Sequence, residues 1–312
     1  SASYFEKWNL FIENSRNGTF LNSKRFLNYH PSEQFNDSSL LFFKKSSIIA
    51  VIPAAIITEN DGKIFFSHPG STYGGIIIGN KTRINDINEI LKLILEYCKI
   101  KKINQIKIKT PPKIYHRYPS DEVDFCLHYN GFNVRARDLS TCIKLDKLDR
   151  SLMIKNTIVA TNQGKKKGVL VEKSEDFETV WKILIKNLKK HETTPTHTLE
   201  EIKLLKSLFP EKIQLFVAKI DNKIIGASIL FVKNKQAIHT QYLALDYDFE
   251  KTRALNVIID FLINYGIDNG FTYLNIGVST EGFGQKINWG LFRFKEGFGG
   301  RGIIHDLWEK QL

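Results

Sequence analysis

The sequence predicts an α/β protein of two tandem domains with the same fold, each a mixed, mostly antiparallel sheet flanked by helices. Three observations predict this class. The 312 residues exceed the usual size of a single domain. The two halves resemble each other at a constant offset, and in each half a helical apolar pattern leads into a buried strand. We place the domains at residues 1–148 and 149–312, with the boundary in a polar stretch.

The clearest similarity between the halves is a helix followed by a strand. Residues 87–108 read INEILKLILEYCKIKKINQIKI, and residues 255–276, shifted by 168 positions, read LNVIIDFLINYGIDNGFTYLNI. Apolar residues match along the helix, and Tyr97 matches Tyr265. After each helix the apolar residues alternate, which is typical of a strand. Each copy therefore predicts a helix of about four to five turns that leads into a buried strand.

The similarity continues on both sides of this unit. Leu40–Ala54 and Leu215–Leu230 each predict a strand, a polar turn and a second strand, and Asp221-Asn222 suits a hairpin turn. Third strands are expected at Phe65–Ile78 and Ala237–Leu245. The same order of elements in both halves indicates gene duplication with divergence.

Closing strands complete each half. They are expected at Leu139–Leu145 in the first half and at Ile303–Trp308 in the second. Each predicted domain thus ends on a strand that closes its own sheet.

Composition indicates a cytoplasmic protein without a transmembrane segment. The longest apolar run, Ile48–Ile57, has ten residues and contains Pro53, whereas a bilayer crossing needs about 20. The N-terminus has no basic segment followed by an apolar one, as a secretory signal would have. The three cysteines, Cys98, Cys126 and Cys142, have no paired spacing and are expected to be reduced thiols.

No metal site is predicted. The stretch His191-Glu192 followed by His197 lacks the spacing of a zinc-binding helix, so it is interpreted as a loop over the cleft.

The net charge of +12 leaves two interpretations open. Such a charge attracts phosphates, whether on a nucleic acid, on a nucleotide or at an anionic membrane surface. The richness in Ile, Lys and Asn is equally typical of an AT-rich genome, and the lysines are scattered, with one tight run at Lys165-Lys166-Lys167.

The order of elements resembles the GNAT acyltransferase fold, and the tandem pair resembles the Fem (FemAB-like) family of aminoacyl- and acyltransferases. The segments His239-Thr240-Gln241-Tyr242, Gly277–Glu281 and Asn288–Gly299 are similar to the HxQY, GxSTE and LNxGLxxFKExFG motifs of its polysaccharide-associated, cell-envelope branch. The resemblance covers essentially the whole chain. It implies N-acyl transfer to an amine, with an amino-sugar or nucleotide-linked precursor of the cell envelope as acceptor.

The acyl donor stays open. GNAT enzymes that use acetyl-CoA carry a glycine-rich loop that holds the pyrophosphate at a helix N-terminus. Here the corresponding segment, Asp246–Arg253, has no glycine and three acids. The helical hairpin of many aminoacyl-tRNA users is also missing, so tRNA is not favoured. No permanently bound cofactor is expected, and acyl-CoA remains a candidate co-substrate.

Three residues of the second domain are the candidate catalytic groups. Glu281 follows a buried strand, where an open α/β sheet places its ligands, and it is a candidate general base or a binding group for the acceptor ammonium. Its alternative role is that of an acid near the start of a helix. His239 is a candidate proton carrier or a core residue. Tyr242 is a candidate proton donor to the leaving group, or packs in the core.

Further residues are candidates for substrate binding. Strict alternation along the strand places His239 and Gln241 on one face and Tyr242 on the other. We expect a cleft at the carboxyl ends of the second domain's strands, facing the first domain, around Glu281, His239 and Lys295. The candidate substrate-binding residues are Gln241, Ser279, Asn288 and Lys295, the cations Lys251 and Arg253 before the repeated helix, and His68 and Tyr73 in a glycine-rich bend of the first domain.

Two functions remain at this point. The first is an N-acyltransferase that uses a small-molecule acyl donor and an amino-sugar or nucleotide-sugar acceptor. The second is a degenerate GNAT module that binds an anionic glycan precursor without catalysis; a tRNA-dependent aminoacyltransferase is a further variant of the first.

Overall fold

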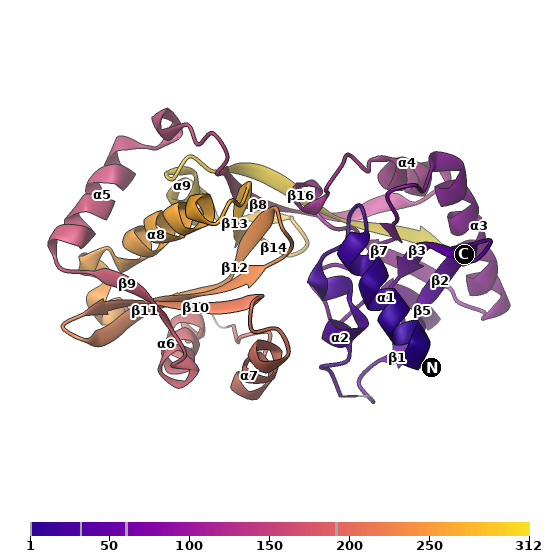
Figure 1. The fold of residues 1–312 in the computed structure, drawn as a ribbon, viewed down its shortest axis with the longest axis horizontal. Helices are drawn as coiled ribbons and strands as arrows, with labels where there is room; N and C mark the ends of the chain where they lie inside the picture. Colours follow the sequence, from indigo (N-terminus) through magenta and orange to yellow (C-terminus); the bar gives the residue numbers. More distant parts are fainter. Residues whose placement is uncertain (1, 32, 60–61, 191–192) are drawn as a thin grey trace. The chain divides into compact units, whose positions relative to one another are not determined.

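The computed structural model describes residues 2–31, 33–59, 62–190 and 193–312, and it divides into two compact units (Figure 1). The first unit runs to Asp138 and includes Gly282–Gly284 and Ile304–Leu312, and the second consists of Leu139–Glu281 and Gln285–Ile303. Strands β8 (Asn133–Lys144) and β16 (Arg301–Gln311) each contribute residues to both units. Along the chain, the first compact unit therefore gives way to the second after Asp138. The domain boundary expected at residues 148 and 149 stays a prediction.

The first unit combines helices with two sheets. Its helices are α1 (Ala2–Asn14), α2 (Lys24–Leu27), α3 (Ile84–Ile100) and α4 (Glu122–Tyr129). Its strands are β1 (Asn36–Asp37), β2 (Leu40–Lys44), β3 (Ser47–Ile52), β4 (Ala55–Glu59), β5 (Gly62–Ser67), β6 (Ile77–Ile78) and β7 (Gln105–Lys109), with parts of β8 and β16. Strands β2, β3 and β6 form a small sheet of their own, while β1, β4, β5, β7 and β16 follow one another in the larger one.

The second unit consists of a mixed sheet with helices on both faces and a separate two-stranded ladder of β14 and β15. Its helices are α5 (Lys155–Lys166), α6 (Phe177–Lys189), α7 (Leu199–Leu208), α8 (Ala254–Asp268) and α9 (Trp289–Glu296). Its strands are β9 (Leu170–Ser174), β10 (Ile213–Ile220), β11 (Lys223–Val232), β12 (Ala237–Leu245), β13 (Tyr273–Val278), β14 (Thr280–Glu281) and β15 (Lys286–Ile287). Helices α6 and α7 lie on one side of this sheet and α8 on the other (Figure 1).

The repeated helix and strand are confirmed in both units. In the first, β5 and β7 are parallel neighbours and α3 lies between them in the chain. In the second, β12 and β13 are parallel and α8 lies between them. A parallel pair needs such a crossover, because a tight hairpin can join only antiparallel strands. The predicted α/β fold of two tandem domains, each with a mixed sheet and helices, is therefore confirmed.

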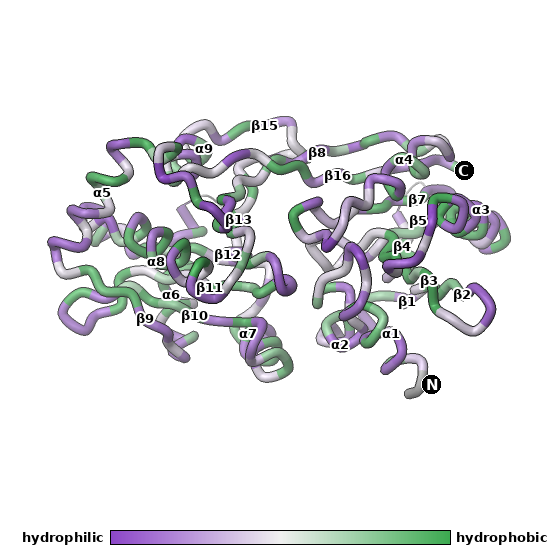
Figure 2. The backbone as a smooth tube through the Cα atoms, turned by 45° about the horizontal axis from the view of Figure 1, so that its top comes forward, coloured by the Kyte–Doolittle hydropathy of each residue, from purple (hydrophilic) through white to green (hydrophobic). Residues whose placement is uncertain are grey.

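One hydrophobic core of the second unit lies between the sheet and α8. Helix α8 directs Ile258, Ile259, Leu262 and Ile263 toward the sheet, and each of them is buried. Hydrophobic residues are concentrated along β10, β11 and α8 (Figure 2). Close packing of this apolar layer fixes the positions and directions of β12 and β13, which carry the candidate site.

The third strand expected at Phe65–Ile78 is not continuous. The stretch forms β5 and, after a bend rich in glycine, the short β6, and the two strands belong to different sheets. Pro53 similarly separates β3 from β4, because proline has no N–H for the ladder. The hairpin of β10 and β11 in the second unit pairs along both strands, with one irregularity at Ala218 and Lys219, and it turns at Asp221 and Asn222 as predicted.

The predicted closing strands form, but each pairs with the opposite half of the repeat. Tyr273, Leu274 and Asn275 of β13 pair with Lys144, Ile143 and Cys142 of β8. Residues 307–311 of β16 pair with residues 105–109 of β7. Because both partners follow equivalent helices, the exchange preserves the same antiparallel ladder in each unit. Among the described residues, no helix is long and apolar enough to cross a membrane.

We predict that Leu145→Ala destabilises the second unit. Leu145 is 2 % exposed in the core beside α8 and lies against Gly266. Removing the side chain leaves a cavity, which typically lowers the free energy of unfolding by about 2–5 kcal/mol. Urea unfolding measures this loss, and hydrogen exchange should increase in α8 and β13.

The control is Leu93→Ala in α3, where the leucine is 52 % exposed and truncation should have little effect. If Leu145→Ala increased exchange in α3 and β7 alone, the assignment of this segment to the second core would be wrong.

Candidate functional site

The strands β12 and β13 part in the middle of their length. They pair in parallel over three positions, from Ala237 with Tyr273 to His239 with Asn275. Beyond this point each strand continues, to Leu245 and to Val278, without pairing to the other. A parting between parallel strands exposes backbone groups toward the space between them, which makes it a natural location for a ligand.

A β-bulge in β12 lies just after the parting. On β11, Leu230 pairs with Thr240 and the preceding residue, Ile229, pairs with Tyr242, so Gln241 is the extra residue. The bulge changes the alternation of side chains. His239 and Tyr242 therefore share one face, since they pair with residues two apart on β11, and the expectation that they lie on opposite faces was wrong.

Lys295 extends from α9 to the end of β13. Its Nζ donates to the carbonyl oxygens of Gly277, at 2.8 Å, and Val278, at 2.7 Å. The side chain is 5 % exposed. Gly277 has φ +83°, a conformation that glycine adopts without strain. Its amide donates at 2.8 Å to Oδ1 of the buried Asn275, which supports this turn of the backbone.

His239 and Lys295 flank the same point. A Cβ atom placed on Gly277 would lie 3.9 Å from Cε1 of His239 and 3.9 Å from Nζ of Lys295. The carbonyl oxygen of Thr240, beside the bulge, lies at the same distance. The structure thus brings together two of the predicted residues, an imidazole and an amine, where the parallel strands part.

Burial makes the amine of Lys295 a group that titrates near neutrality. Desolvation lowers its pKa from 10.5 to about 7. As a neutral amine it uses its two N–H bonds on the two carbonyls and keeps a lone pair; as an ammonium it has one further N–H to donate. It can therefore accept a proton, or hydrogen-bond to an oxyanion, at the same position.

Tyr242 is paired with His197, a residue in the loop before α7. The phenol oxygen lies 2.7 Å from Nδ1 of His197 and accepts the backbone N–H of the same residue at 3.2 Å. Burial raises the pKa of Tyr242, so it is a neutral phenol at neutral pH. Trp181 of α6 packs edge-on against its ring. His191 and Glu192, expected in this loop, lie outside the described residues.

Ser279, Glu281 and Asn288 lie in the segment that leads from β13 to α9. Oγ of Ser279 is buried and has no hydrogen-bond partner in the part of the chain that the structure describes. The carbonyl of Ser279 accepts from the amide of Asn288 at 3.0 Å, and Asn288 caps α9 by accepting from Leu291. Glu281 is exposed, in the short ladder of β14 and β15, and forms an ion pair of 3.1 Å with Lys286.

Lys251 and Arg253 lie before α8 and are exposed. Arg253 has φ +64° and precedes the first helical residue. In the same segment Asp246 and Asp248 share the ammonium of Lys186, at 2.9 and 2.8 Å. Carboxylates at the start of this helix oppose binding of a pyrophosphate there.

The two candidates of the first unit have different environments. Tyr73 is a core residue, 1 % exposed, whose hydroxyl donates to Oγ1 of Thr19 at 3.1 Å. His68 is buried in a pocket lined in part by His30, Phe35 and Asp37. Burial lowers the pKa of His68 to about 4, so its imidazole is neutral. Both residues stay predictions for substrate binding.

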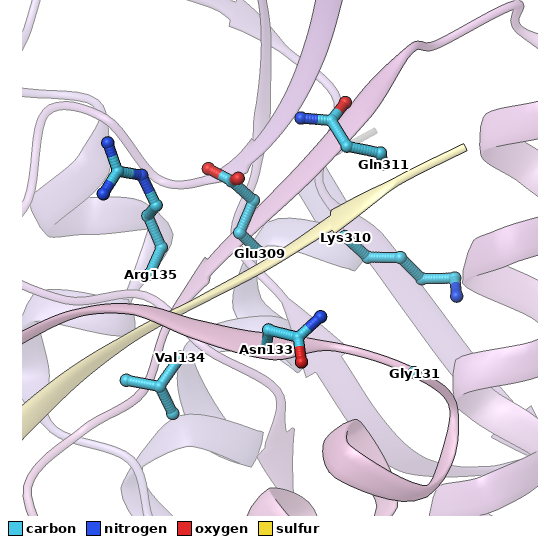
Figure 3. Close-up of a pocket in the computed structure, with 7 residues that line it drawn as sticks. All are labelled: Gly131, Asn133, Val134, Arg135, Glu309, Lys310 and Gln311. Carbon is cyan, nitrogen blue, oxygen red and sulfur yellow. The ribbon is translucent and has the colours of Figure 1, made fainter.

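The pockets of the first unit do not contain the second unit's candidates. One of them is lined by Gly131, Asn133, Val134, Arg135, Glu309, Lys310 and Gln311 (Figure 3). Another lies at the start of α3, where it includes Lys81 and Arg83. No group of three potential metal ligands occurs within the described ranges. The cleft expected around Glu281, His239 and Lys295 stays a prediction.

Sequence reasoning did not select Asn275, His197 or Lys233 as site residues; it placed His197 only in a loop over the cleft. Asn275 is a polar residue between two apolar ones in a buried strand, which is a detectable signal. Lys233 is fully buried after β11, with its ammonium 5.0 Å from the ring centre of Phe231, and burial lowers its pKa to about 7. Lys233 contacts Phe231, which is the partner of His239 on β11. Sequence spacing could not predict that Lys233 lies near His239, because this depends on the register of the two strands.

Comparisons with known proteins agree with the fold. No protein-family model matches the sequence, and no curated protein matches it. A crystal structure of FemX is similar with a TM-score of 0.74 and 12 % identity, over 99 % of this chain and 96 % of that one. L-PGS from Bacillus licheniformis has a TM-score of 0.63 and 13 % identity, over 97 % and 90 %. A tandem GNAT protein from the clavulanic acid biosynthesis pathway has a TM-score of 0.53 and 8 % identity, over 99 % and 94 %.

We predict that the stability of the protein depends on pH through Lys295. With the folded pKa lowered to about 7 from 10.5, the unfolded chain binds this proton between these two values and the folded chain does not. The penalty for burying the ammonium is therefore complete below pH 7 and is relieved as the pH rises toward 10.5. Urea unfolding should show wild type gaining stability over this range relative to Lys295→Met.

Lys233→Met is the matched control for the direction of the pH dependence. Because burial also lowers the pKa of Lys233 to about 7, this variant should lose part of the same gain in stability with rising pH. Equal pH slopes for wild type and Lys295→Met would contradict a lowered pKa at Lys295.

Proposed function

We propose that this protein is a cytoplasmic N-acyltransferase that transfers an acyl or aminoacyl group to the amine of an amino-sugar or nucleotide-linked precursor of the cell envelope. The observation that carries the proposal is the buried Lys295 amine beside His239, where β12 and β13 part. The structural likeness to FemX and to a tandem GNAT protein supports the reaction class. The motifs around residues 239, 277 and 288 support the polysaccharide-associated branch.

Acyl transfer to an amine requires a base, an oxyanion donor and alignment of two substrates. The acceptor ammonium first loses a proton, and its nitrogen then attacks the acyl carbonyl carbon. A C–N bond forms and the carbonyl oxygen becomes an oxyanion. Collapse of this intermediate breaks the bond to the leaving group. The nitrogen gives up its second proton to form the amide, and the leaving group, a thiolate or an alkoxide, takes up one proton. Each of these steps needs a polar group near the reacting carbonyl.

Lys295 and His239 are the groups proposed to act at the reacting atoms. The two carbonyls hold Nζ of Lys295 in one position, so no side-chain freedom is lost when substrate binds. A pKa of about 7 allows both protonation states at neutral pH. We assign proton removal from the acceptor to His239 and stabilisation of the oxyanion to the Lys295 ammonium.

Tyr242 is proposed to supply the proton of the leaving group. Its raised pKa keeps it protonated, and it lies on the same face of the sheet as His239. The contact with Nδ1 of His197, at 2.7 Å, holds the phenol oxygen in place. Ser279 is proposed to bind substrate through its unpartnered Oγ, and Gln241 through the polar groups exposed by the bulge.

Glu281 is proposed to bind the acceptor ammonium and not to act as the base. Its carboxylate is exposed and forms an ion pair with Lys286, which suits a group that binds a cation. The surface lysine is easily displaced, because an exposed ion pair contributes about 1 kcal/mol or less. Lys286 or Asn288 would then contact other polar groups of the acceptor.

Acyl-CoA and aminoacyl-tRNA differ in whether the segment before α8 has to bind a pyrophosphate. Asp246 and Asp248 are engaged with Lys186, and their charge opposes a CoA pyrophosphate at this helix. An aminoacyl-tRNA terminus needs no such contact. Acyl-CoA and aminoacyl-tRNA are therefore tested in parallel as donors.

The acidic segment also favours a second candidate function, a module that binds an anionic glycan precursor without catalysis. Calorimetric titration separates the two. Binding of a UDP-linked amino sugar without turnover, from any acyl-CoA or from aminoacyl-tRNA, would establish the binding module.

We predict that Lys295→Met lowers kcat by about 10²–10⁴, because it removes the group at the reacting carbonyl. The assay follows transfer of labelled acyl groups, from acetyl-CoA or from mixed aminoacyl-tRNA, to a UDP-linked amino sugar. Glu281→Gln should raise KM for the amine while kcat changes little.

Lys235→Met, at an exposed lysine in the turn between β11 and β12, is the matched control and should behave like wild type. Near-native turnover of Lys295→Met would remove Lys295 from the mechanism. If Glu281→Gln instead lost kcat together with a basic pH limb, Glu281 would be the base.

A further inference from the structure

Helix α5 and the residues before it present apolar side chains to solvent. Leu152, Ile154, Ile158 and Val159 are between 42 and 47 % exposed. Ile154 and Ile158 are one helical turn apart, so they share a face, and Val159 lies beside them. Hydrophobic and hydrophilic residues alternate along this segment (Figure 2). A single exposed apolar residue is ordinary, but four within eight positions form a patch. We call these four residues the α5 patch.

The α5 patch is exposed because the helix packs through its small residues. Thr161 and Gly164 form the buried side of α5. A Cβ on Gly164 would lie 2.6 Å from Cγ2 of Val257 and 3.0 Å from the carbonyl of Thr252, so only glycine allows this close approach to α8. The hydroxyl of Thr161 donates to the carbonyl of Thr157 at 2.9 Å. The polarity of the helix is thus inverted, with small polar residues inside and isoleucine outside.

Basic residues are frequent in the segment that carries the α5 patch. Residues 147–167 contain six lysines and arginines and one acid, Asp149. Lys165 forms an ion pair with Asp260 at 2.6 Å. Lys155 and Lys166 lie on the stripe of Val159, at one and two helical turns from it. Lysine at these positions can extend its ammonium beyond the apolar residues while its methylene chain covers them.

We propose that the α5 patch and its lysines dock this protein on an anionic lipid bilayer. An interfacial helix combines apolar side chains that enter the boundary of the acyl chains with cations that pair with acidic headgroups. Lysine is depleted at protein–protein interfaces, so the same composition is a poor match for a protein partner. The net charge of +12 adds attraction over the whole molecule. The proposal is independent of the proposed enzymatic function.

Sedimentation with vesicles tests the proposal. Full-length protein is mixed with vesicles of phosphatidylcholine alone and of phosphatidylcholine with phosphatidylglycerol. We expect binding to the anionic vesicles only, decreasing with added salt. The double variant Ile154→Ser/Ile158→Ser should lower the partition constant about tenfold or more. Lys155→Gln and Lys166→Gln should each lower it roughly fivefold.

The matched control is Ile185→Ser/Leu204→Ser. These residues of α6 and α7 are 49 and 44 % exposed, on the other side of the sheet from α8. Circular dichroism checks that each variant is folded, and the lysine variants test the proposal if the isoleucine variant is not. Absence of binding to anionic vesicles, or equal losses in control and patch variants, would overturn the proposal. So would a wild-type dimer, detected by light scattering, that Ile154→Ser/Ile158→Ser dissociates, since the α5 patch would then be a contact between copies.

Discussion

The buried amine of Lys295 is the interaction on which the candidate site depends. Its two hydrogen bonds go to successive carbonyls, of Gly277 and Val278, at the end of a buried strand. Regular strands direct successive carbonyls to opposite sides, so this arrangement requires the positive φ of Gly277. The amine therefore closes the end of β13 where β12 no longer pairs with it. An unpaired ammonium at this depth would be far less stable.

The packing behind the site explains how a polar cluster is tolerated there. Helix α8 covers one face of the sheet with an apolar layer, and His239 and Tyr242 lie on the opposite face. The exchange of β8 gives β13 a second neighbour along Tyr273–Asn275. With hydrogen bonds on both edges over this stretch, β13 is held rigidly up to Asn275. The irregular turn at Gly277 then begins from a fixed point.

The two surfaces with proposed roles use charge in opposite ways. At the site, burial lowers the pKa of Lys295 to about 7, which makes protonation responsive near neutrality. On α5 the lysines are exposed to solvent, which suits attraction to an anionic surface. The acids before α8 are paired with Lys186. They bear on the identity of the acyl donor, and they belong neither to the Lys295 site nor to the α5 patch. A single value of net charge therefore says little about any one of these functions.

The sequence by itself determined the repeat, since the apolar spacing of α3 and α8 and the alternation in β7 and β13 are local patterns that a core must satisfy. Motif resemblance also selected His239 and Lys295. Only the tertiary structure decided which strand closes which sheet. The alternation of side chains in Leu139–Leu145 would suit pairing with β7 as well as the observed pairing with β13. The bulge at Gln241, the contact of His197 with Tyr242 and the exposed isoleucines of α5 were likewise not predictable. Each depends on register or on packing between segments distant in the chain, and neither property leaves a periodic trace in the sequence.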